Sequence, residues 1–526
     1  MKTNPAQIAV IRTGIIVALA LWLAFYAGTA IADEDDIFLE GFAGLSVGAI
    51  LWMLAGNNFW IYVVASTFLS GGFPILGNTT IDVVLSGVGI CKYLVDRVVM
   101  VKTRLKYGFQ PDFLYLCGFM SVVLVHAMID RLGLRVLGSE VWGGRFYIMM
   151  LVSFVSYFII ISSKFEASAW KKLPTLILGI YLFDACMGIL TAAVPSIIPV
   201  VGHIYDGISL TNYEDASMGI SEDASGRIGA IGQFAFGMLM LIFARYNIGN
   251  LWRPNYAIAF FGTLFGVAGV LFGGFRSGVA NTFFLFVAIG LRDLKARVVL
   301  LVAIAIGFLA VMPLVNQIAE MPLPVQRALA FLPGMRPEIT EDADNSNAFR
   351  IGVWTYWYNN YFFKNWAFGR GFGFDPEFAS DAEVSNTHNP FWEKQMIETG
   401  SIHNGLISSV DCVGVFGAFF FILWNITVFM RVFRYLYREH RQDDNPALKY
   451  LALYLFVSIL SYWEGALNIG AYTVRQFLVV AVFNMLLAEQ RAKIAEIKKK
   501  KTWKPNLRSE QVLSAAPGRF TPQSIR

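Results

Sequence analysis

A histidine-asparagine pair, His403-Asn404, stands directly before a long apolar run that begins at Gly405. An imidazole changes charge near neutral pH, so a histidine at the edge of a membrane-spanning segment can take a proton from a substrate hydroxyl. The simpler interpretation is a side chain that caps or hydrogen-bonds the following helix. A second pair, His388-Asn389, lies in a polar stretch with no span directly behind it. His403 is therefore the candidate general base.

Two arginines stand next to the ends of apolar segments. Arg227 precedes the segment that starts at Ile228, and Arg276 lies within the glycine-rich run 273–278. A guanidinium group binds phosphate oxygens in a bidentate manner and stays charged at any working pH. The competing explanation is an arm that reaches up from a helix end to the membrane surface. The glycines on both sides of Arg276 favour a crowded site, and hence the binding of a phosphorylated substrate.

An aromatic and glycine-rich stretch precedes the histidine. It contains Trp354 among other aromatic residues, and then the run Gly-Arg-Gly-Phe-Gly, in which Gly371 and Gly373 are the second and third glycines. Aromatic rings offer faces to sugars, but Trp and Tyr also gather at every membrane interface, which is the commoner reason for them. The glycines permit the close approach of another backbone or of a ligand.

The elements that carry these residues are predicted to be transmembrane helices. The chain has 526 residues, of which 56% are hydrophobic and 15% charged, and its mean hydropathy is +0.55. This composition lies outside the range of soluble globular proteins. Apolar runs of about 20 residues, enough to cross a bilayer, recur from Ile8 to Leu487. We predict an all-α, polytopic membrane protein with about 12–14 transmembrane helices and one large outer loop that itself contains helices.

Basic residues are sorted between the two sides of these predicted helices. By the positive-inside rule the basic side is the cytoplasm, so both termini are expected there. The opposite side receives the acidic run Asp33–Asp36 and the long segment before His403. The predicted organisation is N-terminal transmembrane helices over 1–317, the large outer loop over 318–402, C-terminal transmembrane helices over 403–490, and a basic, disordered cytoplasmic tail over 491–526.

Taken together, the motifs resemble the signature of the O-antigen ligase and O-antigen polymerase family. Its main element here is His403-Asn404, an aliphatic residue, and then Gly414 and Gly417, eleven and fourteen places after the histidine. The run 275–278 resembles the family's Ser-Arg-Gly step, with Phe275 in place of a small residue. The run 226–229 resembles an earlier Arg-x-Gly step of the family. Arg350 and Trp354 resemble residues of its loop helix, and the run 369–373 resembles the glycine-rich end of that loop. The resemblance covers the chain from residue 226 to the last span.

Two further departures are Asn365-Trp366, where a proline is typical, and Asp411, which replaces a glutamate one place away. These leave the subfamily open.

The resemblance implies a bacterial glycosyltransferase of the GT-C type in the inner membrane, which takes a glycan from a polyprenyl diphosphate on the periplasmic face. Arg276, Arg227 and Arg350 would hold the diphosphate, and His403 would take the proton from the attacking sugar hydroxyl. Asn404, Trp354, Gly371 and Gly373 are then expected to contact substrate. The acceptor is a glycan, a lipid or a protein, and membrane lipid is the other partner; no nucleic acid is expected.

No cofactor is expected, because the diphosphate is already a good leaving group. No metal site is expected either, since the cysteines show no ligand spacing and lie in apolar runs. These are Cys91, Cys117, Cys186 and Cys412.

Two alternatives remain open. Within the class, ligase, polymerase and protein O-oligosaccharyltransferase share the donor and are not separated by motifs. Outside it, a lipid-linked glycan flippase or another polytopic carrier fits a multi-span chain with charges at membrane level, although no internal repeat of the kind many transporters show is visible.

Overall fold

The computed structural model describes residues 58–73, 79–100, 111–129, 144–163, 167–197, 201, 205, 229–294, 298–372, 392–398, 400, 402–440, 445–464 and 469–514. These residues are almost entirely helical. One short antiparallel ribbon, β1 (Gly72–Phe73) paired with β2 (Thr79–Thr80), is the exception among them. The predicted all-α architecture is confirmed for this part of the chain.

Six helices of the described residues are long and apolar enough to cross a membrane. Their apolar spans are Asp112–Ile129, Gly144–Ser162, Ser168–Thr191, Pro254–Phe272, Gly405–Glu439 and Pro446–Trp463. The protein is therefore a multi-pass helical membrane protein. The larger number of spans stays a prediction, because several of the expected ones, including those before residue 58, lie outside the described residues.

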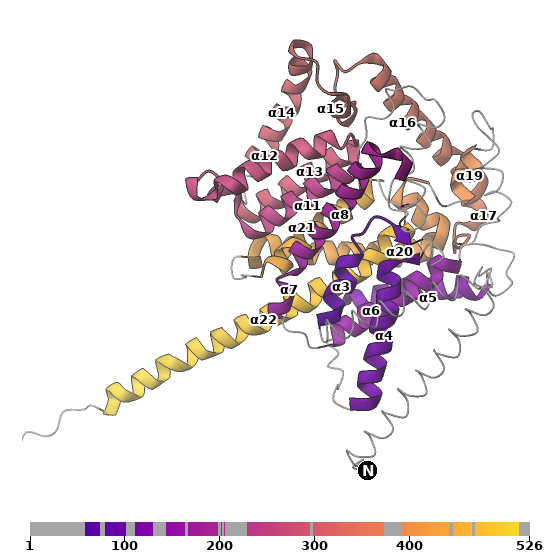
Figure 1. Ribbon diagram of the computed structural model, residues 1–526. Coiled ribbons are helices and arrows are strands. Elements are labelled where there is room, and N and C mark those ends of the chain that lie inside the picture. The colour runs from indigo at the N-terminus through magenta and orange to yellow at the C-terminus, as the bar shows by residue number, and fades with distance from the viewer. Residues whose placement is uncertain are drawn as a thin grey trace, which may run out of the picture.

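The helices before residue 319 form the first part of the bundle (Figure 1). They are α3 (Phe59–Ser66), α4 (Ile81–Met100), α5 (Pro111–Ile129), α6 (Gly144–Ser162), α7 (Ala167–Trp170), α8 (Leu173–Ala193), α11 (Gly229–Arg245), α12 (Ala257–Phe272), α13 (Arg276–Ile289) and α14 (Val298–Ile318). Three long helices, α20 (Gly405–Arg434), α21 (Pro446–Glu464) and α22 (Ile469–Ser514), complete it. Of the α21 span 72% is buried, against 22% of the α12 span, so α21 is central and α12 faces outward.

Further helices lie between α14 and α20 in the described parts of the segment 318–402. They are α15 (Leu323–Ala328), α16 (Pro337–Trp357), α17 (Phe363–Asn365) and α19 (Trp392–Glu398), with a π-helical turn, Tyr358–Phe362, between α16 and α17. Figure 1 shows them together at the top and right, beyond the bundle. Val353 and Trp357 of α16 pack with Ile397 of α19 and Ile402 in a small hydrophobic cluster, which joins this group to the start of α20.

A break divides α20 at Gly414, whose φ of 65° and ψ of −179° are not helical. Four backbone hydrogen bonds from the segment 366–371 occupy the groups that the break leaves unpaired. The bonds run from Arg370 N to Asp411 O (2.8 Å), Gly371 N to Cys412 O (3.0 Å), Val415 N to Trp366 O (2.7 Å) and Phe416 N to Ala367 O (3.2 Å). Such irregular backbone is stable at membrane depth only where protein satisfies it.

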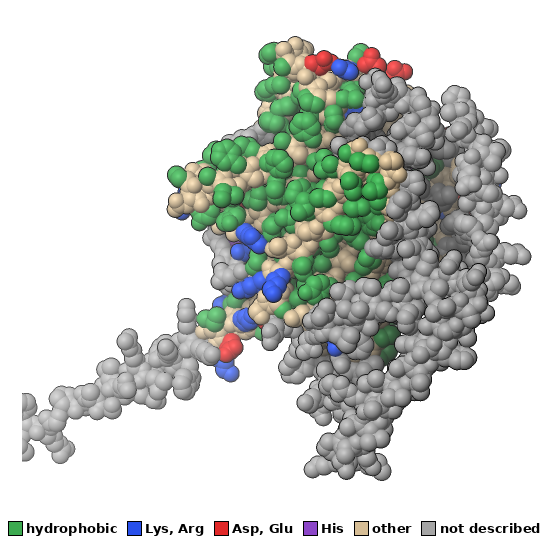
Figure 2. Space-filling view, viewed as in Figure 1, with side chains coloured by type: hydrophobic (Ala, Val, Ile, Leu, Met, Phe, Trp, Pro, Cys, Tyr) green, Lys and Arg blue, Asp and Glu red, His purple; other side chains and the backbone are tan. Residues whose placement is uncertain are grey.

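Charged side chains lie at opposite ends of the apolar surface. Figure 2 shows a broad hydrophobic face between a group of Lys and Arg side chains near α7 and α22 and a mainly acidic group at the top, near α14 to α16. The hydrophobic face is the part of this view that matches a bilayer's interior.

The last helix differs from the expected disordered tail after residue 490. It continues through Ser514 and projects from the bundle (Figure 1). Many of the residues after Gln490 are Ala, Glu, Lys and Arg, which favour helices, and Lys493 pairs with Glu489 at 2.9 Å and four-residue spacing.

Candidate active site

One side of α16 carries residues that contact three other parts of the chain. Ala343, Asn347, Arg350, Trp354 and Trp357 follow one another at intervals of four, three, four and three residues, which places them along one side of a helix. We call this set the α16 face. The distant sequence motifs meet along it.

Arg276 contacts the N-terminal half of the α16 face. It is the first residue of α13, after a tight turn in which Gly274 has a φ of 74°. Its Nη1 donates to Asn347 Oδ1 at 3.3 Å and to the Ala343 carbonyl at 3.5 Å. A side chain on Gly273 would approach the Gly232 backbone of α11 to 2.9 Å. The crowding predicted around Arg276 is therefore present, and it fixes the start of α13.

His403 lies beside the next turn of the α16 face. Its φ is 53°, the left-handed conformation, and among the described residues no other non-glycine residue has a positive φ. Such a backbone is uncommon outside glycine and clusters at functional sites. The side chain is exposed at the surface, yet partial desolvation lowers the pKa of His403, and the nearby Arg350 guanidinium lowers it further. A lower pKa favours the neutral imidazole, which is the form that a general base requires.

Hydrogen bonds hold the residues on both sides of His403. The indole Nε1 of Trp354 donates to the Ile402 carbonyl at 3.1 Å. The Asn404 side chain accepts from Ile407 N at 3.0 Å and so caps α20. Trp354 and Asn404, predicted as substrate contacts, are thereby given positioning roles that fix the histidine between them.

A buried ion-pair network lies next to the segment that carries His403. Trp357 Nε1 donates to Asp411 Oδ1 at 2.8 Å, and Arg370 Nε donates to Asp411 Oδ2 at 2.8 Å. Arg370 also pairs with Glu398 of α19 at 3.3 Å and donates to the Ile397 carbonyl. Only 1% of the Asp411 side chain and 12% of the Arg370 side chain are exposed. The network joins α16, α19, α20 and the segment 366–371.

The sequence motifs did not identify this network. Asp411 stood in an apolar run, for which a hydrogen bond between helices is the ordinary expectation, and Arg370 was read only as part of a glycine turn. A carboxylate inside a membrane segment needs a partner nearby. That requirement is the one signal that could have pointed to Arg370.

The glycine turn has a packing role. Gly371 is buried and its N–H is occupied by the Cys412 carbonyl, so this group is not available to a substrate. The turn is fixed further where His126 Nε2 of α5 contacts Phe368 O at 2.5 Å and Phe372 N donates to the Tyr147 hydroxyl of α6 at 2.9 Å.

Two predicted site residues, Arg227 and Gly373, lie outside the described residues. The first residue of α11, Gly229, is described, and a Cβ there would lie 2.9 Å from the Phe275 ring. Gly229 therefore packs against Phe275, the residue directly before Arg276. Of the predicted set, Arg276 contacts one end of the α16 face, and Arg350 of the same face lies near His403.

Within the described part of the chain, no group of three or more His, Cys, Asp or Glu side chains is arranged to hold a metal ion. The side chains that meet at the α16 face are two guanidinium groups, an imidazole and an indole, a set suited to an anion rather than a cation. Chemically, it can bind a negatively charged substrate and accept a proton.

No family model and no curated protein matches the chain.

Proposed function

We propose that this protein is a membrane glycosyltransferase of the O-antigen ligase and polymerase type, which transfers or polymerises a glycan carried on polyprenyl diphosphate. The observation that carries the proposal is that one side of α16 is contacted by Arg276 at one turn and carries Arg350 near His403 at the next. Guanidinium groups and an imidazole along one side of a helix suit the reaction of an anionic diphosphate donor with a hydroxyl acceptor.

The proposed location is the bacterial inner membrane, with the α16 face on the periplasmic side and both termini in the cytoplasm. The separation of basic and acidic side chains in Figure 2 supports this orientation. The segment 318–402 is then a periplasmic platform above the bundle. A lipid-linked donor would reach it from the outer leaflet.

In the proposed mechanism the glycosidic bond to the diphosphate breaks as the acceptor oxygen attacks the anomeric carbon. Arg276 and Arg350 neutralise the charge that develops on the departing diphosphate. His403 receives the proton of the acceptor hydroxyl. The electron pair of the broken bond stays on the diphosphate, and one direct displacement inverts the anomeric carbon.

The proposal is tested by incubating purified protein with a polyprenyl diphosphate oligosaccharide and candidate acceptors, and measuring new glycosidic product. Wild-type protein is expected to form product, and Arg276→Gln to lower kcat/KM by roughly 10²-fold, as for loss of one transition-state donor. The matched control is Arg253→Gln, an exposed arginine before α12, which is expected to keep full activity. Equal activity of the Arg276 and Arg253 variants would contradict the assignment.

The carrier alternative is separated by a second measurement on the same preparation. Proteoliposomes with labelled donor in one leaflet report whether the lipid crosses the bilayer. Crossing without product, unaffected by Arg276→Gln, would favour a flippase. Among transferases, the identity of the accepted hydroxyl distinguishes polymerase, lipid ligase and protein O-oligosaccharyltransferase.

The pH dependence of kcat/KM is expected to follow the neutral form of His403. Activity is lost as pH falls through its pKa, which lies below the ordinary histidine value of 6.5. Arg350→Gln removes one of the two causes of this lowering, so the acid limb should move to higher pH. Arg350→Lys retains the positive charge and should leave the limb near its wild-type position. An acid limb that is the same in all three proteins would exclude His403 as the titrating base.

A further inference from the structure

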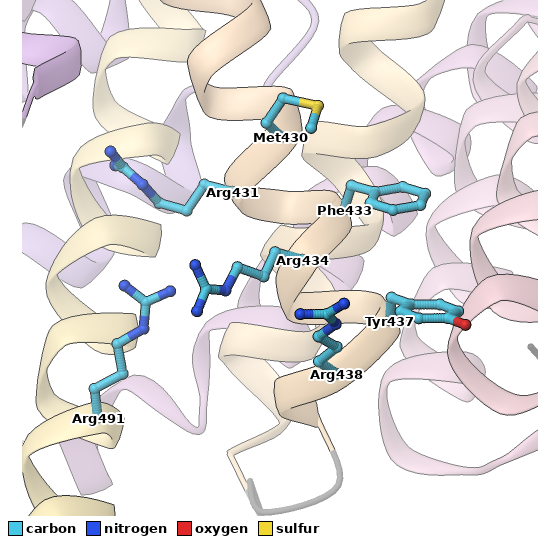
Figure 3. Close-up of a pocket in the computed structure, with 7 residues that line it drawn as sticks. All are labelled: Met430, Arg431, Phe433, Arg434, Tyr437, Arg438 and Arg491. Atoms are coloured by element: carbon cyan, nitrogen blue, oxygen red, sulfur yellow. The ribbon is translucent and has the colours of Figure 1, made fainter.

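A basic cavity lies at the other end of α20, far along the helix from His403. It has a volume of about 490 Å³ and is formed by the last turns of α20, its π-helical continuation Tyr435–Glu439, and α22. Arg434, Arg438 and Arg491 are among its lining residues, and Figure 3 shows Arg434 between the other two. None of the residues that line it belongs to the α16 face, so it is a separate site.

The cavity carries an excess of positive charge. Its fourth arginine, Arg431, is already neutralised by the fully buried Asp112 of α5, with Nη–Oδ distances of 2.8 and 3.1 Å. Arg434 and Arg491 share one carboxylate, Glu439, at 3.3 and 3.0 Å. Arg438 has no carboxylate within ion-pair distance among the described residues. Among the described residues, Glu439 is thus the one carboxylate paired with any of these three guanidinium groups, which leaves them an excess of positive charge.

The arginines of the cavity are held on one side of the helix pair by ion pairs and helix geometry. Glu439 pairs with both Arg434 of α20 and Arg491 of α22, and the side chains of these two arginines point toward each other in Figure 3. Arg438 follows Arg434 by four residues and therefore lies on the same side of the helix. Arginines that merely reach for the membrane surface would not require a shared carboxylate or a concave site between two helices. This geometry favours a doubly or singly charged oxyanion such as a phosphate.

Apolar side chains border the cavity on its membrane side. Met430 is 58% exposed and precedes Arg434 by one helical turn. Phe433 stacks on Tyr437, with ring centroids 6.0 Å apart. A ligand that fills the cavity therefore meets charge at its head and hydrocarbon beside it. That combination matches a phospholipid better than a free anion.

We propose that this cavity binds the phosphate of an anionic phospholipid from the leaflet on the basic side of the membrane. The Arg434, Arg438 and Arg491 guanidinium groups contact the headgroup, and an acyl chain lies along Met430 and Phe433. The site does not depend on the proposed glycosyltransferase activity.

The test is native mass spectrometry of the purified full-length protein, with phosphatidylglycerol or phosphatidylcholine added in detergent. Wild type is expected to retain phosphatidylglycerol in preference to phosphatidylcholine. Arg434→Gln/Arg438→Gln should weaken phosphatidylglycerol binding by roughly 30-fold, from the usual contribution of two basic side chains at an anionic surface. Arg434→Lys/Arg438→Lys, which keeps both charges, should retain most of the binding.

The matched control is Arg253→Gln/Lys493→Gln, which removes two exposed positive charges outside the cavity and should bind like wild type. Thermal unfolding without added lipid checks that the cavity variant is folded. Equal loss in the cavity and control variants would overturn the proposal, since charge alone would then explain retention. Complete displacement of phosphatidylglycerol by millimolar inorganic phosphate would also overturn it, because the site would then select a free anion.

Discussion

His403→Asn is expected to lower the rate of glycan transfer by roughly 10²–10⁴-fold, the usual contribution of a general base. Asparagine is among the few residues that tolerate the left-handed conformation, in which His403 has a φ of 53°. The turn held by Trp354 and Asn404 should therefore keep its shape. What the variant lacks is a nitrogen that accepts a proton near neutral pH. Product formation from a polyprenyl diphosphate donor, measured at saturating acceptor, reports the loss.

The second histidine-asparagine pair of the sequence provides the control for this experiment. His388→Asn makes the same chemical change at the rival position and is expected to keep activity within a few-fold of wild type. Thermal unfolding of His403→Asn should match that of wild type, which separates chemistry from folding. Inactivation by His388→Asn with retained activity in His403→Asn would reverse the assignment of the base.

Arg370→Ala is expected to lower the free energy of unfolding by about 3–5 kcal/mol, the usual cost of leaving one member of a buried ion pair alone. Its partner Asp411 is 1% exposed and would keep only the Trp357 indole as its hydrogen-bond donor among the contacts described above. Glu398 would lose the same guanidinium. The effect is measured as a decrease in Tm, from thermal unfolding in mild detergent monitored by tryptophan fluorescence.

An exposed ion pair of the same segment supplies the control. Arg336 and Glu320 are 45% and 62% exposed, so Arg336→Ala should change stability by no more than about 1 kcal/mol. The double variant Arg370→Met/Asp411→Asn removes both charges and should recover part of the loss. If Arg336→Ala and Arg370→Ala shift Tm equally, the network of Arg370 does not stabilise the site.

The local sequence was informative where a residue's role depends on its immediate neighbours. His403 could be found because it stands before an apolar run, and Arg276 because glycines crowd it on both sides. Arg350 was selected because Arg350 and Trp354 resemble residues of the family's loop helix. In the structure its guanidinium group lies near enough to His403 to lower the pKa of the imidazole. Helices were predictable across the apolar runs, since a bilayer leaves the backbone few other choices.

Roles that depend on partners distant in the chain were not predictable in this way. Gly414 stands inside a continuous apolar run, so the break in α20 has no local signal, and the segment 366–371 that satisfies it is more than forty residues away. The pairing of Arg370 with Asp411 could not be predicted for the same reason, because the two residues are 41 positions apart in the chain. Gly371 was expected to approach a ligand, whereas it approaches another part of the backbone. The N–H of Gly371 is bonded to the Cys412 carbonyl, and a contact of Gly371 with substrate stays a prediction.

The break at Gly414 also divides α20 into two pieces of unequal length. The first piece, Gly405–Val413, rises only about 13 Å, so it is too short to cross a bilayer by itself. Its backbone is hydrogen-bonded to the segment 366–372, which is held in turn by side chains of α5 and α6. The axis of this piece is thus set by the platform around it. The candidate base, His403, directly precedes this first piece, which joins the longer second piece of α20 through the single glycine Gly414.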